Sequence, residues 1–419
     1  MVEAAPQQAQ EHAAFLRRLA EAGPGSGQAR LGHGAFLTLR LVDLLDPERP
    51  RVRLDAFGYQ LAAMDRVSRE LPGDSTETAH LIGLMRATAD AFRSRDSQLV
   101  VPALLAYAHY LEDDLMLSEA LDVLETAVRV GGDALRASDR VASRLRMARV
   151  LRKLNEFDAA EAAYEEAGAL AAEGGDQHSE LLSRIGRANT VLGRGNLMQA
   201  ERSLREVLLD SETVGDPEAQ ARAHQGLAVV LATAGQPVEA IPHLWKAVER
   251  YEDATSRTRA LTDLGGMLLM VGDPNGAERA LTEVVHRGGT QDFVTNAMIE
   301  LMHCASYRRD RLAFERWRAR CKAREDDMPP NILTDFRLKT GIGRARFGQF
   351  DRAQALLRTA LTLAEKFELN EFVFRIERVT HGLRDCQQGC EAPSVAVTDP
   401  GLPYDAVRDV SSALAHRSK

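Results

Sequence analysis

The sequence predicts an all-α fold, a right-handed α-solenoid of antiparallel helix hairpins, and three observations carry the prediction. Apolar residues recur at spacings of three and four along most of the 419 residues, as they do on one face of a helix. Breaks that contain Gly and Pro interrupt these stripes where a helix ends and the next one begins. A set of small residues returns about every 40 positions, which is typical of a repeat protein.

The composition agrees with helices and excludes several other classes. Aromatic residues make up only 5%, whereas a β-sandwich needs many aromatic and β-branched residues. The formal net charge of −8 favours solubility and disfavours a nucleic-acid-binding role for the chain as a whole. No run of about 18 uncharged apolar residues occurs, so we expect no membrane-spanning helix and no membrane partner.

The N-terminus and the cysteines point to the cytoplasm. The first residues lack a basic segment followed by an apolar one, so we expect no signal peptide. Four cysteines without a regular framework indicate reduced thiols in a cytoplasmic chain. They are Cys304, Cys321, Cys386 and Cys390.

One hairpin can be followed in residues 226–249, GLAVVLATAGQPVEAIPHLWKAVE. Apolar residues at helical spacing precede and follow the break TAGQP. Gly235 is expected to end the first helix and Pro237 to open the second. Small Ala240 allows the two helices to approach, and Leu244 fills the space toward the next repeat. Leu244→Ala is therefore expected to cost about 2–5 kcal/mol.

The same arrangement returns along the chain, with a small residue in the second helix, a large one four positions later and another small one twelve positions earlier. The small second-helix residues are Ala120, Ala160, Ala200, Ala240, Ala277, Ala313 and Ala353. Their separations of 40, 40, 40, 37, 36 and 40 residues predict about seven hairpins. The copy around Ala313 is degraded.

The clearest copies are ARVLRKLNEFDAAEAAYEEAGAL (148–170) and GRARFGQFDRAQALLRTAL (343–361). Over residues 101–383 the chain resembles the tetratricopeptide repeat (TPR) family. It departs from the family pattern in two ways. Its period is nearer 40 than the usual 34 or so residues. The aromatic residue expected early in the first helix is absent, and Trp245 and Trp317 lie in second helices instead. Long repeats of this kind resemble those of bacterial regulators that bind peptides or partner proteins.

The chain divides into three regions by pattern. Residues 1–100 form an off-period helical block, either a divergent repeat pair that caps the solenoid or a separate effector bundle. The TPR-like solenoid covers 101–385, and 386–419 is a linker followed by a short amphipathic helix over 404–417, which either docks on the end of the solenoid or stays mobile. The block lacks a convincing basic recognition helix, which disfavours a DNA-binding helix-turn-helix. Its helices are expected at 8–22, 33–46, 54–71 and 76–94.

The sequence lacks the common motifs of phosphate, metal and nucleophile sites, so we expect no enzyme, no cofactor and no metal. His381, Cys386 and Cys390 supply only three of about four ligands that zinc requires, and are interpreted as residues near a helix end. The acidic clusters EDD at 112–114 and at 325–327 are interpreted as solvated helix ends.

A basic stretch occupies residues 307–326, YRRDRLAFERWRARCKARED. Its cations could contact phosphates or an acidic partner. The interleaved Asp310, Glu315 and Glu325 favour ordinary surface ion pairs instead.

The resemblance to the TPR family implies that the first helix of each repeat lines a concave groove. Polar residues near the small residue of that helix are expected to point into the groove. These residues are Arg149, Arg152, Lys153, Asn189, Arg222, Gln225 and Arg259. Arginine suits carboxylates because its guanidinium can bind them with two hydrogen bonds, and asparagine suits peptide backbone because its amide donates and accepts.

These observations predict a non-catalytic scaffold or adaptor that binds a peptide or protein segment, of acidic character, in the groove. The alternative is a ligand- or peptide-sensing regulator whose N-terminal block is the output module. The two hypotheses differ in whether residues 1–100 pack as a further turn of the solenoid or stand apart. The partner's identity and the oligomeric state stay open.

Overall fold

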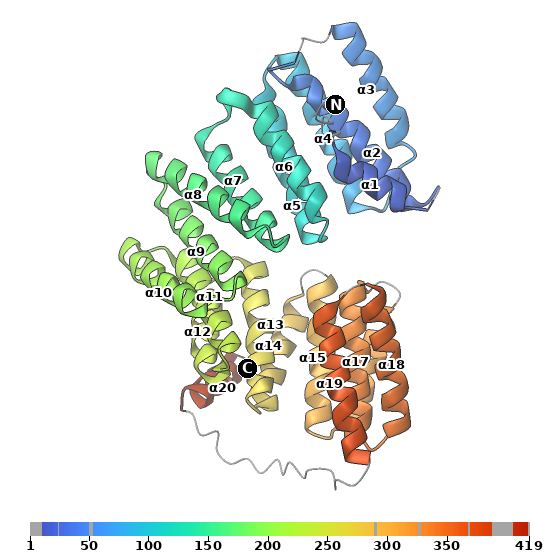
Figure 1. Cartoon of the computed structure of the whole chain (residues 1–419), viewed down its shortest axis with the longest axis vertical. Helices are drawn as coiled ribbons and strands as arrows, with labels where there is room; N and C mark the ends of the chain where they lie inside the picture. The colour runs from blue at the N-terminus through green and yellow to red at the C-terminus, as the bar shows by residue number, and fades with distance from the viewer. Residues whose placement is uncertain are drawn as a thin grey trace, which may run out of the picture. The chain divides into compact units, whose positions relative to one another are not determined.

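The structure, a computed structural model, describes most of the chain, and the described parts are helical. It describes residues 11–23, 25–49, 53–288, 291–325, 328–367, 369–387 and 405–417. Within these ranges the chain forms twenty α-helices joined by short turns and no strand (Figure 1). The predicted all-α fold is confirmed.

Four helices form the N-terminal block, and their number matches the prediction. They are α1 (Ala13–Glu21), α2 (Gly27–Val42), α3 (Leu54–Ser68) and α4 (Thr76–Ser94). The predicted start of α2 at residue 33 is wrong, because Ser26 caps this helix six residues earlier by accepting a hydrogen bond from the backbone N–H of Ala29. Residues 8–10 of the first predicted helix lie outside the described residues.

Seven consecutive helix pairs follow, as the repeat pattern predicted, and two further helices complete the chain (Figure 1). The first helices of the pairs are α5 (Val101–Asp113), α7 (Ala137–Lys153), α9 (Gln177–Gly193), α11 (Pro217–Thr233), α13 (Ala254–Met270), α15 (Gln291–Tyr307) and α17 (Pro330–Arg346). The second helices are α6 (Leu117–Gly131), α8 (Phe157–Glu173), α10 (Leu197–Val214), α12 (Pro237–Arg250), α14 (Pro274–Arg287), α16 (Arg311–Lys322) and α18 (Phe350–Lys366). The last two helices are α19 (Asn370–Gln387) and α20 (Asp405–Arg417).

The hairpin turns follow from the residues that the sequence places there. Gly235 adopts φ of 79° between α11 and α12, a left-handed conformation that glycine reaches without strain. Pro237 occupies the first turn of α12, where its missing N–H is not needed. In the next hairpin Asp273 caps α14 by accepting a hydrogen bond from the N–H of Gly276 at 2.8 Å.

The small residues lie at the helix crossings, as predicted. All seven small second-helix residues of the repeat pattern are buried, including Ala313 of the degraded copy. At Gly265, in the first helix α13, a Cβ atom would lie 2.6 Å from Leu281 Cγ of α14, so only glycine allows this approach. Leu244 is also buried in the core between neighbouring hairpins.

The chain forms two compact units, residues 1–203 and 204–419, and the division falls within α10. In unit 1 one apolar core runs from α1 to α7 and includes Phe15, Leu84 and Leu104. In unit 2 a core runs from α11 to α17, and a smaller one joins α17, α18 and α19.

Within each unit the first helices pack more closely on one another than the second helices do. Contacts join α5 to α7 and α7 to α9 in unit 1, and α13, α15, α17 and α19 in sequence in unit 2. No comparably close contact joins neighbouring second helices among the described residues. In each unit the first helices together form one surface of the stacked hairpins. We call this surface the first-helix face.

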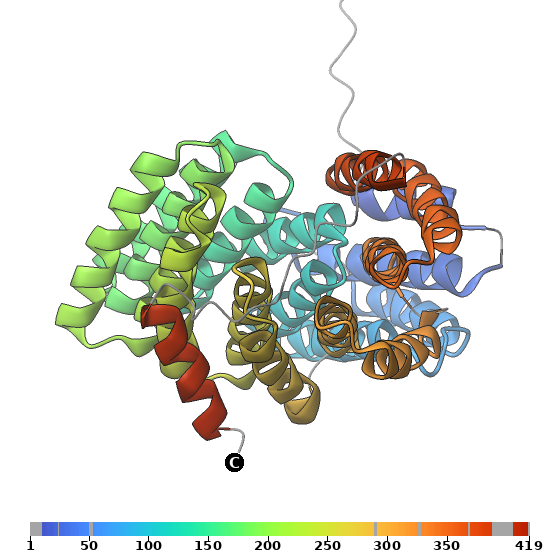
Figure 2. The same cartoon turned by 90° about the horizontal axis from the view of Figure 1, so that it is seen from below.

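The C-terminal helix forms as expected but not at the end of the solenoid. It spans Asp405–Arg417 and packs on the second helices α12 and α14 in the middle of unit 2 (Figure 1, Figure 2). None of the described helices has the length and apolar character that crossing a membrane requires.

The two cysteines in α15 and α16 are buried free thiols. Burial raises the pKa of both Cys304 and Cys321 to about 12, so each stays protonated. Cys390 and the side chain of Cys386 lie outside the described residues, so the three-residue set with His381 is not tested. The described residues hold no group of three or more His, Cys, Asp or Glu side chains suited to a metal ion.

Candidate functional site

Three cations of α7 converge on one buried carboxylate of α5. Glu112 is only 1% exposed. Its Oε2 atom accepts hydrogen bonds from Arg149 Nη2 at 2.6 Å and from Arg146 Nη1 at 3.0 Å, and its Oε1 atom lies 2.8 Å from Lys153 Nζ. The three cations follow one another at spacings of three and four, so they share one side of α7. We call these four residues the Glu112 cluster.

The cluster carries more positive than negative charge. Burial works to raise the pKa of Glu112, but the hydrogen bond and charge of Arg149, followed by those of Lys153, lower it to about 2. Burial and the neighbouring Arg149 lower the pKa of Arg146. The Nε atom of Arg149 is buried without a hydrogen-bond partner. One carboxylate thus faces three partly exposed cations, and this excess of positive charge favours an additional anion.

The other two predicted residues of unit 1 lie on α7 and α9. Arg152 turns toward α8 and hydrogen-bonds the Tyr164 side chain, whose pKa burial raises, and its Nε atom is buried without a partner. The Asn189 side chain is half-buried and makes no hydrogen bond within the described residues. Its amide is therefore available to a ligand.

The predicted residues of unit 2 are held by neighbours on their own and adjacent hairpins. Gln225 of α11 donates to Asp263 Oδ2 of α13 at 2.8 Å and accepts from the Tyr251 hydroxyl at 2.7 Å. Burial raises the pKa of Asp263 against the effect of this hydrogen bond. Arg222 is tied to Glu218 one turn earlier at 2.8 Å, and Arg259 lies 5.4 Å from the centre of the Phe293 ring.

The structure thus joins Arg149 and Lys153 in one cluster. Four of the other predicted residues make separate contacts, and Asn189 makes no hydrogen bond within the described residues. The interpretation of residues 112–114 as a solvated helix end is wrong for Glu112, because α5 continues through this position and turns the side chain toward α7. A signal for its burial is present in the sequence. Glu112 follows Leu104, Ala108 and Leu111 at helical spacing, so it belongs to the buried stripe of α5.

The basic stretch 307–326 is only partly paired. Glu315 pairs with Arg318 and Arg344, Glu325 pairs with Arg337, and Asp310 caps α16. The expectation of surface ion pairs is thus confirmed for Glu315 and Glu325. The remaining exposed cations of this stretch have no carboxylate partner within the described residues. They are Arg309, Arg311, Arg316, Arg320 and Lys322.

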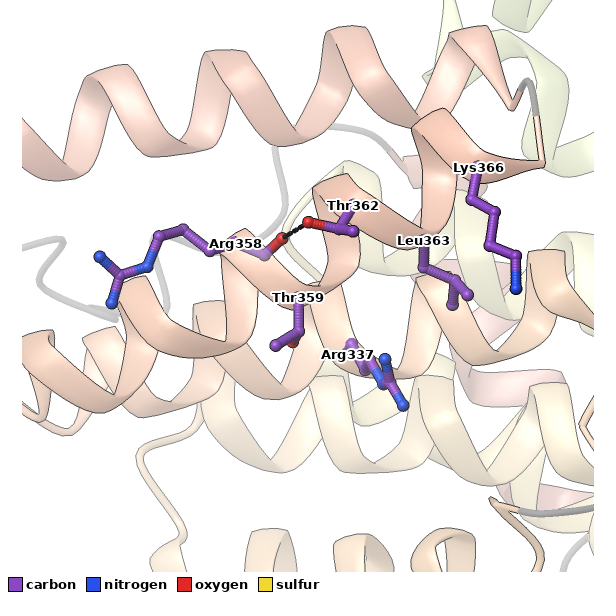
Figure 3. Close-up of a pocket in the computed structure, with 6 residues that line it drawn as sticks. All are labelled: Arg337, Arg358, Thr359, Thr362, Leu363 and Lys366. Carbon is purple, nitrogen blue, oxygen red and sulfur yellow. Dashed lines mark hydrogen bonds between the residues drawn. The ribbon is translucent and has the colours of Figure 1, made fainter.

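A shallow basic pocket of about 310 Å³ lies on α17 and α18 (Figure 3). Its lining residues are Arg337, Arg358, Thr359, Thr362, Leu363 and Lys366. Thr362 donates its hydroxyl to the backbone carbonyl of Arg358 at 3.1 Å, and Arg358 and Lys366 extend toward opposite ends of the pocket (Figure 3). The cations are therefore dispersed, in contrast to those of the Glu112 cluster.

Comparison with solved structures identifies similar helical solenoids. The Rap conjugation gene regulator of the plasmid pLS20, solved in complex with the Phr* peptide, gives a TM-score of 0.52 at 11% identity, over 86% of this chain and 98% of that chain. A Rap protein complexed with competence and sporulation factor gives 0.47 at 11% identity, over 82% and 99%. Aspartyl phosphate phosphatase F from Bacillus subtilis gives 0.47 at 11% identity, over 82% and 94%.

The likeness to the first of these proteins concerns the fold, and it confirms the predicted helical-repeat solenoid. No protein-family model matches the sequence, and no curated protein matches it.

Proposed function

We propose that this protein is a non-catalytic scaffold or adaptor that binds a peptide or protein segment on its first-helix face, with a carboxylate of the ligand at the Glu112 cluster. The observation that carries the proposal is the excess of partly exposed cations around Glu112. A ligand carboxylate would receive charge-assisted hydrogen bonds there. Asn189, on the next first helix, would hold the ligand backbone.

The solved structure with the same fold supports a peptide as the ligand. That Rap regulator is in complex with the Phr* peptide, and its fold extends over 86% of this chain. A cytoplasmic location fits the buried thiols Cys304 and Cys321, which a reducing compartment keeps unpaired.

We further propose that residues 1–100 cap the solenoid, rather than form a separate output module. The apolar core of the block is continuous with that of α5 and α6. Arg18 of α1 donates to both oxygens of Glu77 of α4 at 2.7 and 2.8 Å, and Tyr107 of α5 donates to the same carboxylate at 2.8 Å. A shared buried network of this kind ties the block to the first hairpin.

The test begins with a random peptide library displayed on phage and selected on the full chain. The affinities of the selected peptides are then measured by calorimetry for the wild type, Arg149→Glu and Arg202→Glu. Arg202 is an exposed arginine on the second helix α10, so its reversal changes the same charge away from the first-helix face. We expect at least a tenfold loss for Arg149→Glu and no change for Arg202→Glu.

A second variant separates binding from folding, because Arg149 also supports Glu112. Asn189→Ala removes a side chain that has no hydrogen-bond partner among the described residues, and should weaken the same peptides severalfold at unchanged thermal stability. Peptides that bind both Arg149→Glu and Asn189→Ala as tightly as the wild type would place the binding site elsewhere.

A further inference from the structure

The C-terminal helix α20 fills a groove between two second helices of unit 2. It packs on α12 and α14, which make no close contact with each other (Figure 2). Val407, Val410 and Leu414 of α20 are at most 5% exposed and belong to the core of α11 to α17. Their spacings of three and four place them on one side of the helix, and the other side faces solvent.

Ser411 of α20 lies over Gly276 and makes polar contacts in the groove. Ser411 of α20 donates its hydroxyl to the Asp273 carboxylate, and its backbone carbonyl accepts from Arg279 Nη1 at 3.1 Å. A Cβ atom on Gly276 would overlap Asp273 Oδ2 and would lie 2.6 Å from Ser411 Oγ, so the absence of a side chain at Gly276 leaves space for the Asp273 cap and for Ser411 together. The groove is therefore shaped for a small hydroxyl side chain beside an apolar stripe.

The hairpins beneath α20 also pack directly on one another. Helices α11 to α14 each pack on the next one in sequence, and their core continues into α15 and α17. Among the described helices, by contrast, α20 packs closely on α12 and α14 alone. In this arrangement α20 binds the groove in the way that an amphipathic helical peptide binds a receptor. Its apolar anchors at i, i+3 and i+7 are Val407, Val410 and Leu414.

We propose that the groove between α12 and α14 is a docking site for an amphipathic helix with the arrangement V-x-x-V-S-x-x-L, and that α20 of this chain is its displaceable occupant. Because α20 belongs to the same chain as the groove, it excludes other helices until it leaves. This site lies on the second helices and does not depend on the peptide site proposed for the first-helix face.

The test uses the full chain and a fluorescein-labelled synthetic peptide of residues 405–417. In Val410→Asp/Leu414→Asp the tethered helix carries two charges on its buried side and leaves the groove vacant. Fluorescence anisotropy should show that the peptide binds this variant at least tenfold more tightly than the wild-type chain, in which α20 competes. A folded double variant that does not bind the peptide would overturn the proposal.

A matched pair of peptides tests whether the groove recognises α20 specifically. Ser411 faces Gly276, whereas its neighbour Ser412 is exposed. We expect Ser411→Leu to weaken peptide binding at least tenfold and Ser412→Leu to change it less than twofold. Equal binding of the two peptides would show that apolar surface alone drives docking and would overturn the assignment of the site.

Hydrogen exchange on the wild-type chain keeps the proposal testable if the double variant does not fold. A displaceable α20 exchanges its amides by local opening while α12 and α14 stay protected. Exchange of α20 only together with α12 and α14 would make it an integral part of the fold and contradict the proposal.

Discussion

Buried charges in unit 1 connect segments that are far apart in the sequence. His12 is buried between two carboxylates, with its Nδ1 atom 2.6 Å from Asp122 Oδ1 of α6 and its Nε2 atom 3.1 Å from Asp43 Oδ2 after α2. Arg129 completes the network through Asp43 and Asp46, each at 2.6 Å. Asp43 and Asp46 of this network, like Glu112, are buried beside cations, so removal of one member leaves a buried charge uncompensated.

Removal of the Glu112 charge should destabilise unit 1. In Glu112→Gln three cations lose their buried partner, so we expect the free energy of unfolding to fall by about 2 kcal/mol, a value reduced because the cations are partly exposed. Chemical denaturation measures the change. Asp113→Asn is the matched control, since Asp113 is exposed and should change the value by less than about 0.5 kcal/mol. Equal effects of both variants would show that the cluster is not a structural ion-pair network.

The contribution of His12 to stability should disappear in mild alkali. Burial works to lower the pKa of His12, but hydrogen bonds to Asp122 and Asp43 raise it to about 9. Because this value lies above the unfolded pKa of about 6.5, the contribution is complete below pH 6.5 and is lost as the pH rises through 9.

The pH dependence can be measured by comparison of His12→Gln with the wild type. The difference in free energy of unfolding should shrink by roughly 3 kcal/mol between pH 6 and pH 10. The ring signals of His12 in NMR spectra should titrate near pH 9. A midpoint near 6.5, with a difference that does not vary with pH, would contradict the buried imidazolium.

At the level of single helices, the sequence predicted those features that depend on the residue at one position, such as turns and close helix crossings. The break at Gly235 and Pro237 was predicted because the turn conformation restricts which residues can occupy these positions. The small Ala240 was predicted because two helices approach closely there. The start of α2 was not predicted. Glycine recurs through GPGSGQARLGHG and disfavours a helix there, and only the side-chain cap of Ser26 shows that the helix begins at this point.

Two glycines in helix interiors provide a test of this reasoning. At Gly186 of α9 a Cβ atom would overlap the Tyr164 ring of α8, whereas at Gly83 of α4 nothing lies within 4 Å. Gly186→Ala should lower the free energy of unfolding by about 1–3 kcal/mol through overpacking. Gly83→Ala should raise it by about 0.5–1 kcal/mol, because alanine favours the helix. Thermal denaturation distinguishes the two signs, and stabilisation by Gly186→Ala would contradict the close crossing.

At the level of the whole chain, the positions of the candidate site residues were predicted but their partners were not. The sequence predicted Arg149 and Gln225 on first helices because the repeat fixes their register. Their partners come from the adjacent hairpin: Glu112 is 37 residues from Arg149, and Asp263 is 38 residues from Gln225. Lys339 reaches Glu300 over a separation of 39. Pairs between neighbouring first helices are thus separated by about one repeat, so a search at that spacing would have found these partners.

The apolar core that the N-terminal block shares with α5 and α6 leads to a prediction for this block. Leu84 of α4 is fully buried in the core that also contains Leu104 of α5 and Leu124 of α6. Leu84→Ala should destabilise this core by about 2–5 kcal/mol. If the block caps the solenoid, native-state hydrogen exchange will show the same loss of protection in α4, α5 and α6, because the three helices open together. Leu54→Ala, on the exposed side of α3, should leave all three unchanged. A loss confined to α4 would instead indicate a block that opens independently, as an output module requires.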